Sequence, residues 1–393
     1  MKTSRRTFLA QASLVVGSLA GPGTSTWAAG PHRYRAAIIG RTGGGDYGHG
    51  YDQVFKDVQN VEVVAVADPD PEGRKKAAQR CGATRQYADF REMLATEKPD
   101  LVSIAPRLPD CHREMCLEAI KVCRGIFIEK PFVEVLSEGD EILRAAGPRQ
   151  VKILVAHNRR LSTDFVRVKA LLRQGLIGRV RQVHIYGKQD TRVGGEDMLV
   201  LGVHDFDLMR FYFGDPIWCQ ASVSVGGRDV TAADVGKGRE PLLVAGDTIH
   251  ALFQFPENIM VHWSSVKTSD DWNTAPMRRE RWSFEILGSK GIIGYQSGLD
   301  FRWLESPFVV QAEDGATWKR LPEPANWSWP VHERSFARNL IHAIETGSAP
   351  LCSGADGLWA VEMVAAVYES QRTRSRVAFP LKDRSHPLLR FTA

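Results

Sequence analysis

The sequence is poor in cysteine and has no long apolar run, and each shortage excludes a class of protein. Six cysteines occur in 393 residues and none forms a Cys-x-x-Cys pair, so neither a zinc module nor a dithiol redox centre is expected. We therefore predict no metal site. No apolar stretch reaches the ~20 residues that a membrane-spanning helix requires. Basic residues nowhere gather into a block with aromatic ones, which argues against nucleic acid as a partner.

The remaining composition is that of an ordinary globular chain. Hydrophobic residues make up 43% and charged residues 25% of the sequence, and the formal net charge is +5. No internal repeat or low-complexity tract occurs. A chain of 393 residues is too long for one ordinary domain, so two domains are expected.

The N-terminus carries an export signal rather than part of a fold. Ser4–Leu9 (SRRTFL) is a twin-arginine motif, and a short apolar stretch, Leu9–Ala20, follows it. Thr26 and Ala28 are small residues where a signal peptidase needs them, so residues 1–28 are predicted to be a signal peptide that is removed on export to the periplasm. The alternative is a basic, frayed terminus that carries no export signal.

Residues 33–157 alternate between short apolar runs and helical patterns. The predicted strands are Arg35–Gly40, Val61–Ala67, Leu101–Ala105, Gly125–Glu129 and Val151–Ala156. The predicted helices are Tyr51–Val58, Glu72–Cys81, Arg113–Val122 and Val135–Ala146. Strands and helices that alternate at these lengths indicate a doubly wound parallel sheet, so the fold class is α/β with an N-terminal Rossmann domain.

Residues 158–393 have a different character. Several segments alternate apolar and polar residues with period two, around 217–225, 249–255, 259–263 and 282–286. Such alternation predicts a large, open and mostly antiparallel sheet with one buried face, within an α+β domain. Helices are expected over Phe165–Arg173, His332–Thr346 and Gly357–Thr373, and the last two are candidates to pack back on the first domain. An open sheet needs a cover, so a homo-oligomer, a dimer or a tetramer, is predicted.

A glycine-rich loop follows the first predicted strand. It reads GRTGGGDYGHG from Gly40 to Gly50. The pattern Gly-x-Gly-x-x-Gly fails when counted from Gly40, because Thr42 takes the middle place, but it fits Gly43, Gly45 and Gly48 in a lengthened loop. Glycine allows a tight turn and a close backbone approach to a pyrophosphate, so these residues are predicted to bind a dinucleotide.

Asp68 ends the second predicted strand, where an acid can bind both hydroxyls of the adenosine ribose. This position favours NAD as the cofactor. Arg74, Lys75 and Lys76 follow on the next predicted helix and leave NADP as the alternative. Asp68 is otherwise a turn or cap residue before Pro69.

Four stretches, taken in order, resemble the glucose–fructose oxidoreductase / inositol dehydrogenase / MocA (Gfo/Idh/MocA) family. They are IIGRTGGGDYGHG with VVAVADPDPEGR, then GIFIEKPF, VAHNRRL and LGVHDFDLMRF, and they span nearly all of the chain beyond the signal. The Glu129-Lys130-Pro131 tripeptide is the most specific element. The resemblance implies a Rossmann domain beside a large open sheet, and NAD(P)-dependent oxidation or reduction of a sugar or polyol.

The same resemblance assigns the catalytic residues. The resemblance implies that Lys130, at the end of a strand and beside the nicotinamide, binds the reacting oxygen. It also implies that Glu129 lies at the cofactor. His204 matches the acid/base histidine of the family, and Asp207, which would share its helix face, is expected to contact the substrate. The family commonly has an acid four residues before this histidine, where this chain has Val200. That departure leaves the proton chemistry in question.

Other residues are implied around the pocket. Arg160, in the stretch that begins at His157, is expected to bind a substrate hydroxyl, and solvated loop charge is the alternative. Pro106 is expected to border the nicotinamide, and Arg107 and His112 to reach the substrate.

Three functions follow from these observations. The first is an exported oxidoreductase acting on a sugar, polyol or glycoside with a tightly retained NAD. The second is NAD-dependent glycoside cleavage by transient oxidation and elimination. The third is a noncatalytic sugar-binding relative, which Val200 makes conceivable.

Overall fold

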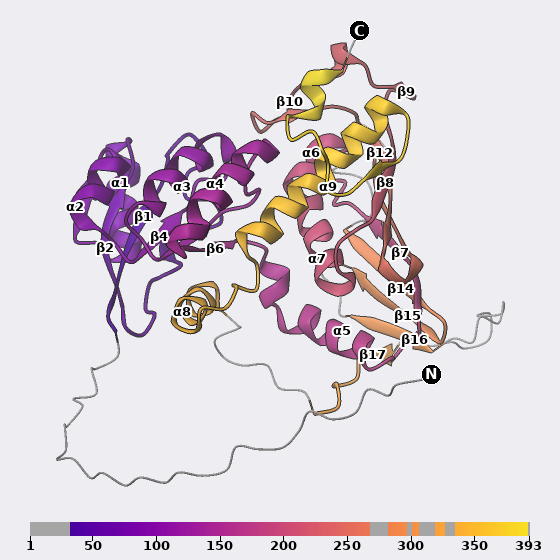
Figure 1. The fold of residues 1–393 in the computed structure, drawn as a ribbon, viewed down its shortest axis with the longest axis horizontal. Coiled ribbons are helices and arrows are strands. Elements are labelled where there is room, and N and C mark those ends of the chain that lie inside the picture. Colours follow the sequence, from indigo (N-terminus) through magenta and orange to yellow (C-terminus); the bar gives the residue numbers. More distant parts are fainter. Residues whose placement is uncertain (1–31, 268–281, 297–300, 306–318, 327–334, 392–393) are drawn as a thin grey trace, which may run out of the picture. The chain divides into compact units, whose positions relative to one another are not determined.

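The computed structural model describes residues 32–267, 282–296, 301–305, 319–326 and 335–391, and two β-sheets organise this part of the chain (Figure 1). The predicted signal peptide, residues 1–28, lies outside the described residues. Within the described ranges, no helix has both the length and the apolar character needed to cross a membrane.

The first sheet has the strand order β3-β2-β1-β4-β5-β6, and all neighbouring strands run parallel. Its strands are β1 (Tyr34–Ile39), β2 (Val61–Ala67), β3 (Arg85–Tyr87), β4 (Leu101–Ile104), β5 (Gly125–Ile128) and β6 (Lys152–Val155). This is the Rossmann order, and it confirms the predicted fold class. The order reverses between β1 and β4, and the carboxyl ends of the strands at such a switch point form a crevice where ligands bind.

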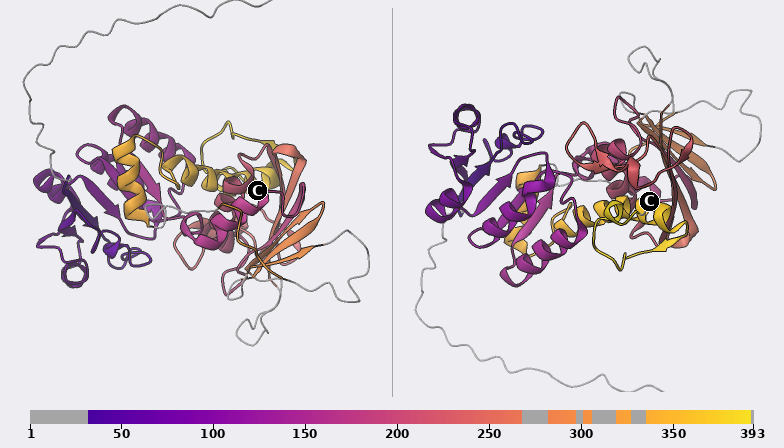
Figure 2. Two further views of the ribbon diagram at one scale, coloured as in Figure 1. Left: turned by 90° about the horizontal axis from the view of Figure 1, so that it is seen from below. Right: turned by 90° about the horizontal axis from the view of Figure 1, so that it is seen from above.

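Helices connect these strands and cover the sheet. They are α1 (Pro71–Cys81), α2 (Phe90–Glu97), α3 (His112–Ile120) and α4 (Leu136–Arg149). A helix from far along the chain, α8 (Phe336–Thr346), packs against β5 and β6 (Figure 2). The packing is close because β5 begins with Gly125, where a Cβ atom would lie 2.7 Å from Cδ1 of Ile344.

The helix expected over Tyr51–Val58 is wrong. Between the glycine-rich loop and β2, all of which the structure describes, only a 3-10 turn forms, η1 (Tyr51–Gln53). Asp57 has a φ of 56°, which a right-handed helix does not allow. The side chain of Asp52 turns inward, where it accepts a 2.6 Å hydrogen bond from Arg80. A phosphate at this loop would therefore meet loop amides and not the first turn of an α-helix.

The second sheet is mixed and mostly antiparallel. Its order is β17-β16-β15-β14-β7-β13-β12-β8-β18, with β9 paired to β8. Its strands are β7 (Val180–Tyr186), β8 (Trp218–Val225), β9 (Arg228–Asp229), β12 (Thr248–Phe255), β13 (Ile259–Val266), β14 (Ser283–Gly288), β15 (Gly291–Gln296), β16 (Arg302–Glu305), β17 (Lys319–Arg320) and β18 (Val377–Ala378). Two further strands, β10 (Gly236–Lys237) and β11 (Leu243–Val244), form a separate pair. The strand β7 runs parallel to β13 and antiparallel to β14.

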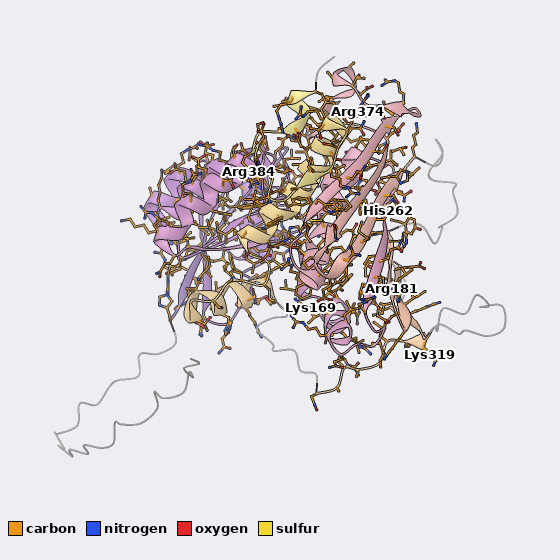
Figure 3. All side chains as sticks on the ribbon, turned by 45° about the vertical axis from the view of Figure 1, so that its right-hand side comes forward. Lys169, Arg181, His262, Lys319, Arg374 and Arg384 are labelled. Atoms are coloured by element: carbon orange, nitrogen blue, oxygen red, sulfur yellow. The ribbon has the colours of Figure 1, made fainter. Side chains whose placement is uncertain are left out.

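Helices cover one face of this sheet (Figure 2). They are α5 (Thr163–Arg173), α6 (Gly195–Asp197), the π-helix η4 (Met198–Gly202), α7 (Val203–Phe213) and α9 (Gly354–Thr373). The ring of Phe206 on α7 lies 5.2 Å from that of Phe253 and 5.5 Å from that of Trp263, so α7 packs directly on the sheet. No described helix covers the other face, where Figure 3 shows Arg181 and His262.

A buried carboxyl group joins this helical layer to the sheet. Oδ2 of Asp197 accepts hydrogen bonds from the backbone N–H of Gln189 (3.0 Å) and the hydroxyl of Ser265 (2.7 Å). Its other oxygen, Oδ1, is buried and has no hydrogen-bond partner within the described ranges. Burial raises the pKa of Asp197 from 3.8 to about 7.

Because the folded state holds this proton more tightly than the unfolded chain does, Asp197 should make the protein lose stability as pH rises from 4 through 7. The full shift corresponds to about 4 kcal/mol. We expect the Asp197→Asn variant to gain in melting temperature relative to wild type between pH 5 and pH 8. The matched control is Asp190→Asn, because the pKa of Asp190 is lowered to about 2 and does not titrate in this range. A difference in melting temperature between Asp197→Asn and wild type that is the same at pH 5 and pH 8 would contradict the raised pKa of Asp197.

Candidate active site

A cavity of about 950 Å³ lies between the carboxyl edge of the first sheet and the helices of the second. Five cationic side chains line it: Arg107, Lys130, Arg159, Lys188 and Arg192. The acidic residue in the lining is Glu240. Five aromatic side chains also line it: Tyr51, Phe165, Trp282, Tyr295 and Phe336. Ion pairs balance part of this charge, with Arg107 3.3 Å from Glu240.

Lys130 reaches this cavity from the end of β5, as predicted, and is followed by a cis peptide bond to Pro131. Its ammonium is 3% exposed and donates a 2.9 Å hydrogen bond to the backbone carbonyl of Val200 in η4. Burial lowers the pKa of Lys130. A buried amine that has one protein acceptor keeps donor capacity for an oxygen in the cavity.

His204 also lines the cavity, from the first turn of α7. Its Nδ1 is buried and has no hydrogen-bond partner among the described residues. Burial, followed by the neighbouring charge of Lys130, holds the pKa of His204 well below its usual range. The ring of His157 lies 5.5 Å away, edge to face, and neither of its nitrogens has a hydrogen-bond partner in the described part of the chain. The surroundings of His204 therefore disfavour its charged form.

No carboxylate among the described residues supports His204 in the way the family's acid would. Asp205 contacts Arg159 and accepts a hydrogen bond from the indole of Trp263 at 3.1 Å. Glu196 accepts a hydrogen bond from the backbone N–H of Glu240 at 3.1 Å. Asp207 turns to a different partner, described below. Val200 contributes its backbone carbonyl to Lys130 and its side chain to the cavity wall.

The glycine-rich loop lies over the carboxyl ends of β4 and β5. A Cβ atom on Gly45 would lie 2.6 Å from the backbone nitrogen of Arg107, and one on Gly48 would lie 2.6 Å from the carbonyl oxygen of Ala105. Gly43 has a φ of 79° and open space around it, so it forms the exposed tip of the loop. The ring of Tyr47 packs against Gly40, where a Cβ atom would lie 2.1 Å from it.

A second cavity, of about 350 Å³, lies at the ends of β1 and β2 and is lined by Gly40 and Asp68. Asp68 is fully buried, and its carboxylate accepts from the backbone N–H and the hydroxyl of Thr42 and from the backbone N–H of Asp70. In this conformation the hydrogen bonds of Asp68 therefore connect the glycine-rich loop to the end of β2. Binding a ribose would require it to exchange these donors for the sugar hydroxyls.

The charges around this second cavity favour NAD over NADP. Arg41 pairs with Asp110 at 2.8 Å, and Arg91 pairs with Glu114. Asp68 and Asp89 add two more carboxylates to the lining, so a 2′-phosphate would meet an excess of negative charge. Lys75 and Lys76, weighed above as phosphate contacts, do not line the cavity.

The two cavities fit the two ends of NAD. The smaller one lies at the end of β2, where an adenosine ribose binds in this fold, and the larger one holds Lys130. Between them run loop glycines at positions that leave no room for a side chain. NAD would thus be held by the loop amides and the ends of β1, β2 and β4. It would supply the hydride donor or acceptor beside Lys130. The described residues contain no group of three or more His, Cys, Asp or Glu side chains that could hold a metal ion.

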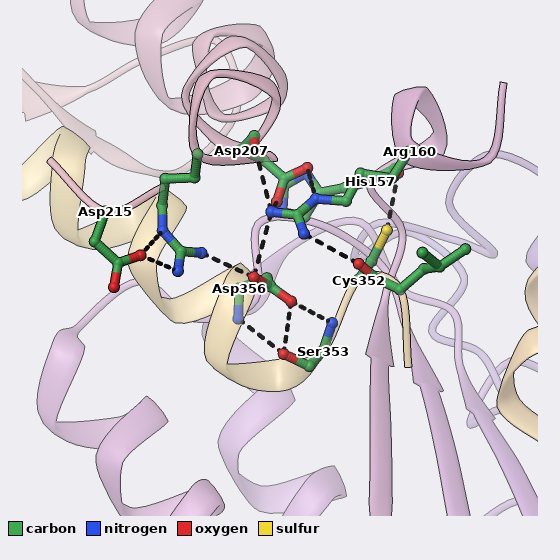
Figure 4. A network of polar contacts seen from close by, with 9 residues as sticks. His157, Arg160, Asp207, Asp215, Cys352, Ser353 and Asp356 are labelled. Carbon is green, nitrogen blue, oxygen red and sulfur yellow. Dashed lines mark hydrogen bonds and ion pairs between the residues drawn. The ribbon is translucent and has the colours of Figure 1, made fainter. Parts of the chain in front are cut away.

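Two predicted substrate residues do not reach the larger cavity, which corrects their assignment. Arg160 donates from Nε to Asp207 at 2.8 Å and lies 3.3 Å from Asp356, and all three belong to a network that also includes Arg210 (Figure 4). Arg160 is 6% exposed and Asp207 is fully buried. Their charges satisfy one another and join η3 (Asn158–Leu161), α7 and α9.

Three further assignments change in the same way. His112 is fully buried, and its ring nitrogens lie 2.8 Å from the carbonyl oxygen of Pro106 and 3.0 Å from that of Phe132. Pro106 is buried and does not line the larger cavity, whereas its neighbour Arg107 does. Glu129 lies beneath the cavity, where its carboxylate accepts from the backbone N–H of Lys130 at 2.6 Å.

Several residues that line the cavity were not among those selected from the sequence. Arg159 lines the cavity, although Arg160 was the predicted donor, because adjacent residues on a tight turn point in different directions. Lys188 and Arg192 come from the loop after β7, a strand that was not predicted. His49 stands at the rim and contacts Glu129. A histidine inside a phosphate-binding loop is the one signal that would have marked it.

Comparisons with known proteins agree with this geometry. Residues 34–157 match the model of an oxidoreductase family described as an NAD-binding Rossmann fold, and residues 169–379 match the C-terminal alpha/beta domain of the same family, Gfo/Idh/MocA. A D-apiose dehydrogenase from Paraburkholderia graminis is 27% identical over 383 residues, which cover 92% of this chain and 94% of that protein. A myo-inositol 2-dehydrogenase from Thermotoga maritima is 22% identical over 350 residues, which cover 86% and 97%.

Solved structures share the fold. A levoglucosan dehydrogenase in complex with NADH and L-sorbose superposes with a TM-score of 0.67 at 19% identity, covering 89% of this chain and all of that one. An oxidoreductase from Agrobacterium radiobacter in complex with NAD+, L-tartaric acid and magnesium gives a TM-score of 0.66 at 21% identity, covering 88% and 98%.

The reassignment of Arg160 predicts a structural phenotype. Arg160→Met would leave the fully buried carboxylate of Asp207 without its ion-pair partner, whereas Asp356 would keep Arg210, so the free energy of unfolding should fall by about 3–5 kcal/mol. The affinity for NADH should change little where the variant remains folded. The control, Arg107→Met, breaks a partly exposed pair and should cost less than about 1 kcal/mol in denaturant unfolding. An Arg160→Met protein as stable as wild type would contradict the structural role.

Proposed function

The chain belongs to the Gfo/Idh/MocA family of NAD-dependent oxidoreductases, and we propose that it transfers hydride to or from a carbinol carbon of a sugar, polyol or glycoside. The observation that carries this proposal is the position of Lys130, whose buried ammonium faces a large cavity at the carboxyl edge of the Rossmann sheet. The names of the two relatives, dehydrogenases of D-apiose and myo-inositol, support the class of substrate.

Lys130 would act on the oxygen that changes its bonding during hydride transfer. In oxidation, the carbinol oxygen gains negative character as its proton leaves, and a fixed donor at that point lowers the barrier. The Val200 carbonyl holds the ammonium in place at 2.9 Å, so little reorganisation is needed when the charge develops. Burial excludes water from the same spot.

The cavity walls suit a polyhydroxylated ring. Aromatic side chains offer apolar surface to the C–H faces of a sugar, and the rings of Phe165 and Tyr295 lie 5.2 Å apart on one wall. The donors Asn158, Arg159 and Ser162 line the cavity from η3 and the start of α5. Polar groups at a few points among apolar walls are typical of a small-molecule site.

The function is tested with a panel of sugars, polyols and glycosides and purified wild-type protein. We expect at least one compound to reduce bound or added NAD, and Lys130→Met to lower kcat at least about 100-fold while the Kd for NADH stays within a few fold. Lys152→Met is the matched control, because Lys152 donates to the carbonyl of Gly347 on an exposed surface and lines neither cavity. Equal rates for Lys130→Met and wild type would reject the catalytic assignment. Release of free sugar from a glycoside without net NADH would instead indicate the oxidation–elimination route.

We further propose that the protein is exported by the twin-arginine pathway with its NAD already bound. Ser4–Leu9 and Ala28 support this proposal, since that pathway carries folded proteins and NAD is made inside the cell. No dinucleotide pool regenerates the cofactor outside the cytoplasm. The protein would therefore retain its NAD, which one substrate reduces and a second substrate reoxidises. The uncovered face of the second sheet supports assembly into a dimer or tetramer (Figure 3).

Expression of the full chain in a bacterium with this pathway tests both proposals. We expect periplasmic protein whose N-terminus begins at Ala29, and light scattering at micromolar concentration that gives the mass of two or four chains. Arg5→Lys combined with Arg6→Lys should retain the precursor in the cytoplasm. An intact Met1 on cytoplasmic wild-type protein would reject export, and a monomeric mass would reject assembly.

A further inference from the structure

A histidine of the glycine-rich loop stands at the rim of the larger cavity, against a buried carboxylate. Nδ1 of His49 contacts Oε1 of Glu129. The side chain of His49 is 56% exposed, whereas that of Glu129 is fully buried at the end of β5. The other carboxylate oxygen of Glu129 accepts the backbone N–H of Lys130 at 2.6 Å.

This contact fixes the imidazole of His49. A carboxylate at Nδ1 selects the tautomer and the ring orientation, and it leaves Nε2 available for a proton exchange. His49 lines the cavity together with Lys130 and His204, so all three groups face one volume. The exposed side of the imidazole connects that volume to solvent.

His204 lacks the same support. Its Nδ1 has no hydrogen-bond partner among the described residues, and the nearby carboxylate of Asp205 is paired with Arg159. Burial, and then the cationic neighbours Lys130 and Arg159, disfavour an imidazolium at this position. An imidazole whose charged form is disfavoured is a poor acceptor for the proton of a hydroxyl.

Resting on the function proposed above, we propose that His49, oriented by Glu129, is the acid/base that exchanges the proton of the substrate hydroxyl. In the oxidation direction, the C–H bond breaks and its electron pair leaves with the hydrogen as hydride to NAD. The O–H bond breaks, its proton passes to Nε2 of His49, and the electron pair left on oxygen forms the C=O bond. Glu129 balances the imidazolium charge, and the ammonium of Lys130 holds the oxygen throughout.

Several polar and charged groups surround His49. Glu129 from β5 is in direct contact, and Lys130 follows it in the chain. The ring of Tyr51 in η1 lies 6.1 Å away, and His204 lines the same cavity from α7. Because Glu129 is the group in direct contact, replacing it tests whether it orients the imidazole.

The first experiment uses no substrate. The ring-nitrogen signals of His49 are assigned in NMR spectra by their loss in His49→Gln and are then compared between wild type and Glu129→Gln. We expect the Nδ1 signal of His49 to shift in Glu129→Gln, because the carboxylate that selects the tautomer is replaced by a neutral amide. Unchanged ring-nitrogen signals would show that the two side chains do not interact and would overturn the proposal.

The second experiment measures kcat/KM on a compound that wild type oxidises. His49→Gln keeps a hydrogen-bonding group beside Glu129 but has no imidazole nitrogen to accept the proton, so kcat/KM should fall about 100-fold or more. Binding of NADH, followed by fluorescence, should stay at the wild-type level. The matched control is His342→Gln, on α8 and outside the cavity lining, which should retain the wild-type kcat/KM.

The outcomes separate this inference from the function on which it rests. Wild type that oxidises a sugar while His49→Gln keeps the wild-type kcat/KM would reject His49 as the acid/base and leave the oxidoreductase function standing. Wild type that oxidises nothing in the panel would reject the proposed function, while the NMR comparison would still decide the pairing of His49 with Glu129.

Discussion

The hydrogen bond from the ammonium of Lys130 to the carbonyl of Val200 is the contact on which the site depends. It spans 2.9 Å and joins the end of a parallel strand to a π-helical turn on the second sheet's helical layer. A buried ammonium is costly unless it is hydrogen-bonded, so this bond positions the two layers and the reactive nitrogen at once. π-Helical turns occur often at functional sites, and here the turn presents a carbonyl to the lysine.

The other charges near the cavity divide into two groups by what they contact. Arg160, Asp207 and Asp356 satisfy one another within a closed network, and such pairs join elements without serving a ligand (Figure 4). Lys130 and His49 both line the cavity. The contacts of these side chains, and not their residue types, therefore separate charges that join elements from groups that are open to a ligand.

Sequence reasoning succeeded where local pattern and burial coincide. Continuous apolar runs marked β1, β2, β4, β5 and β6, and the Glu-Lys-Pro tripeptide marked Lys130. It missed β7, because the run VRQVHIY carries polar residues that mask its central place in the sheet. The helix over 51–58 was wrong because a positive φ at Asp57 and an inward Asp52 are tertiary properties. Arg159 and Arg160 are neighbours in sequence, and only the fold decides which of them faces the cavity.

The account predicts that NAD lies along the carboxyl edge of the first sheet with its reactive ring against Lys130. A crystal structure of the protein with NADH tests this directly. We expect the adenosine at the cavity beside Asp68 and the nicotinamide in the larger cavity, with Nζ of Lys130 within about 3–3.5 Å of an oxygen placed for hydride transfer. NADH bound elsewhere, or a nicotinamide ring far from Lys130, would contradict the account.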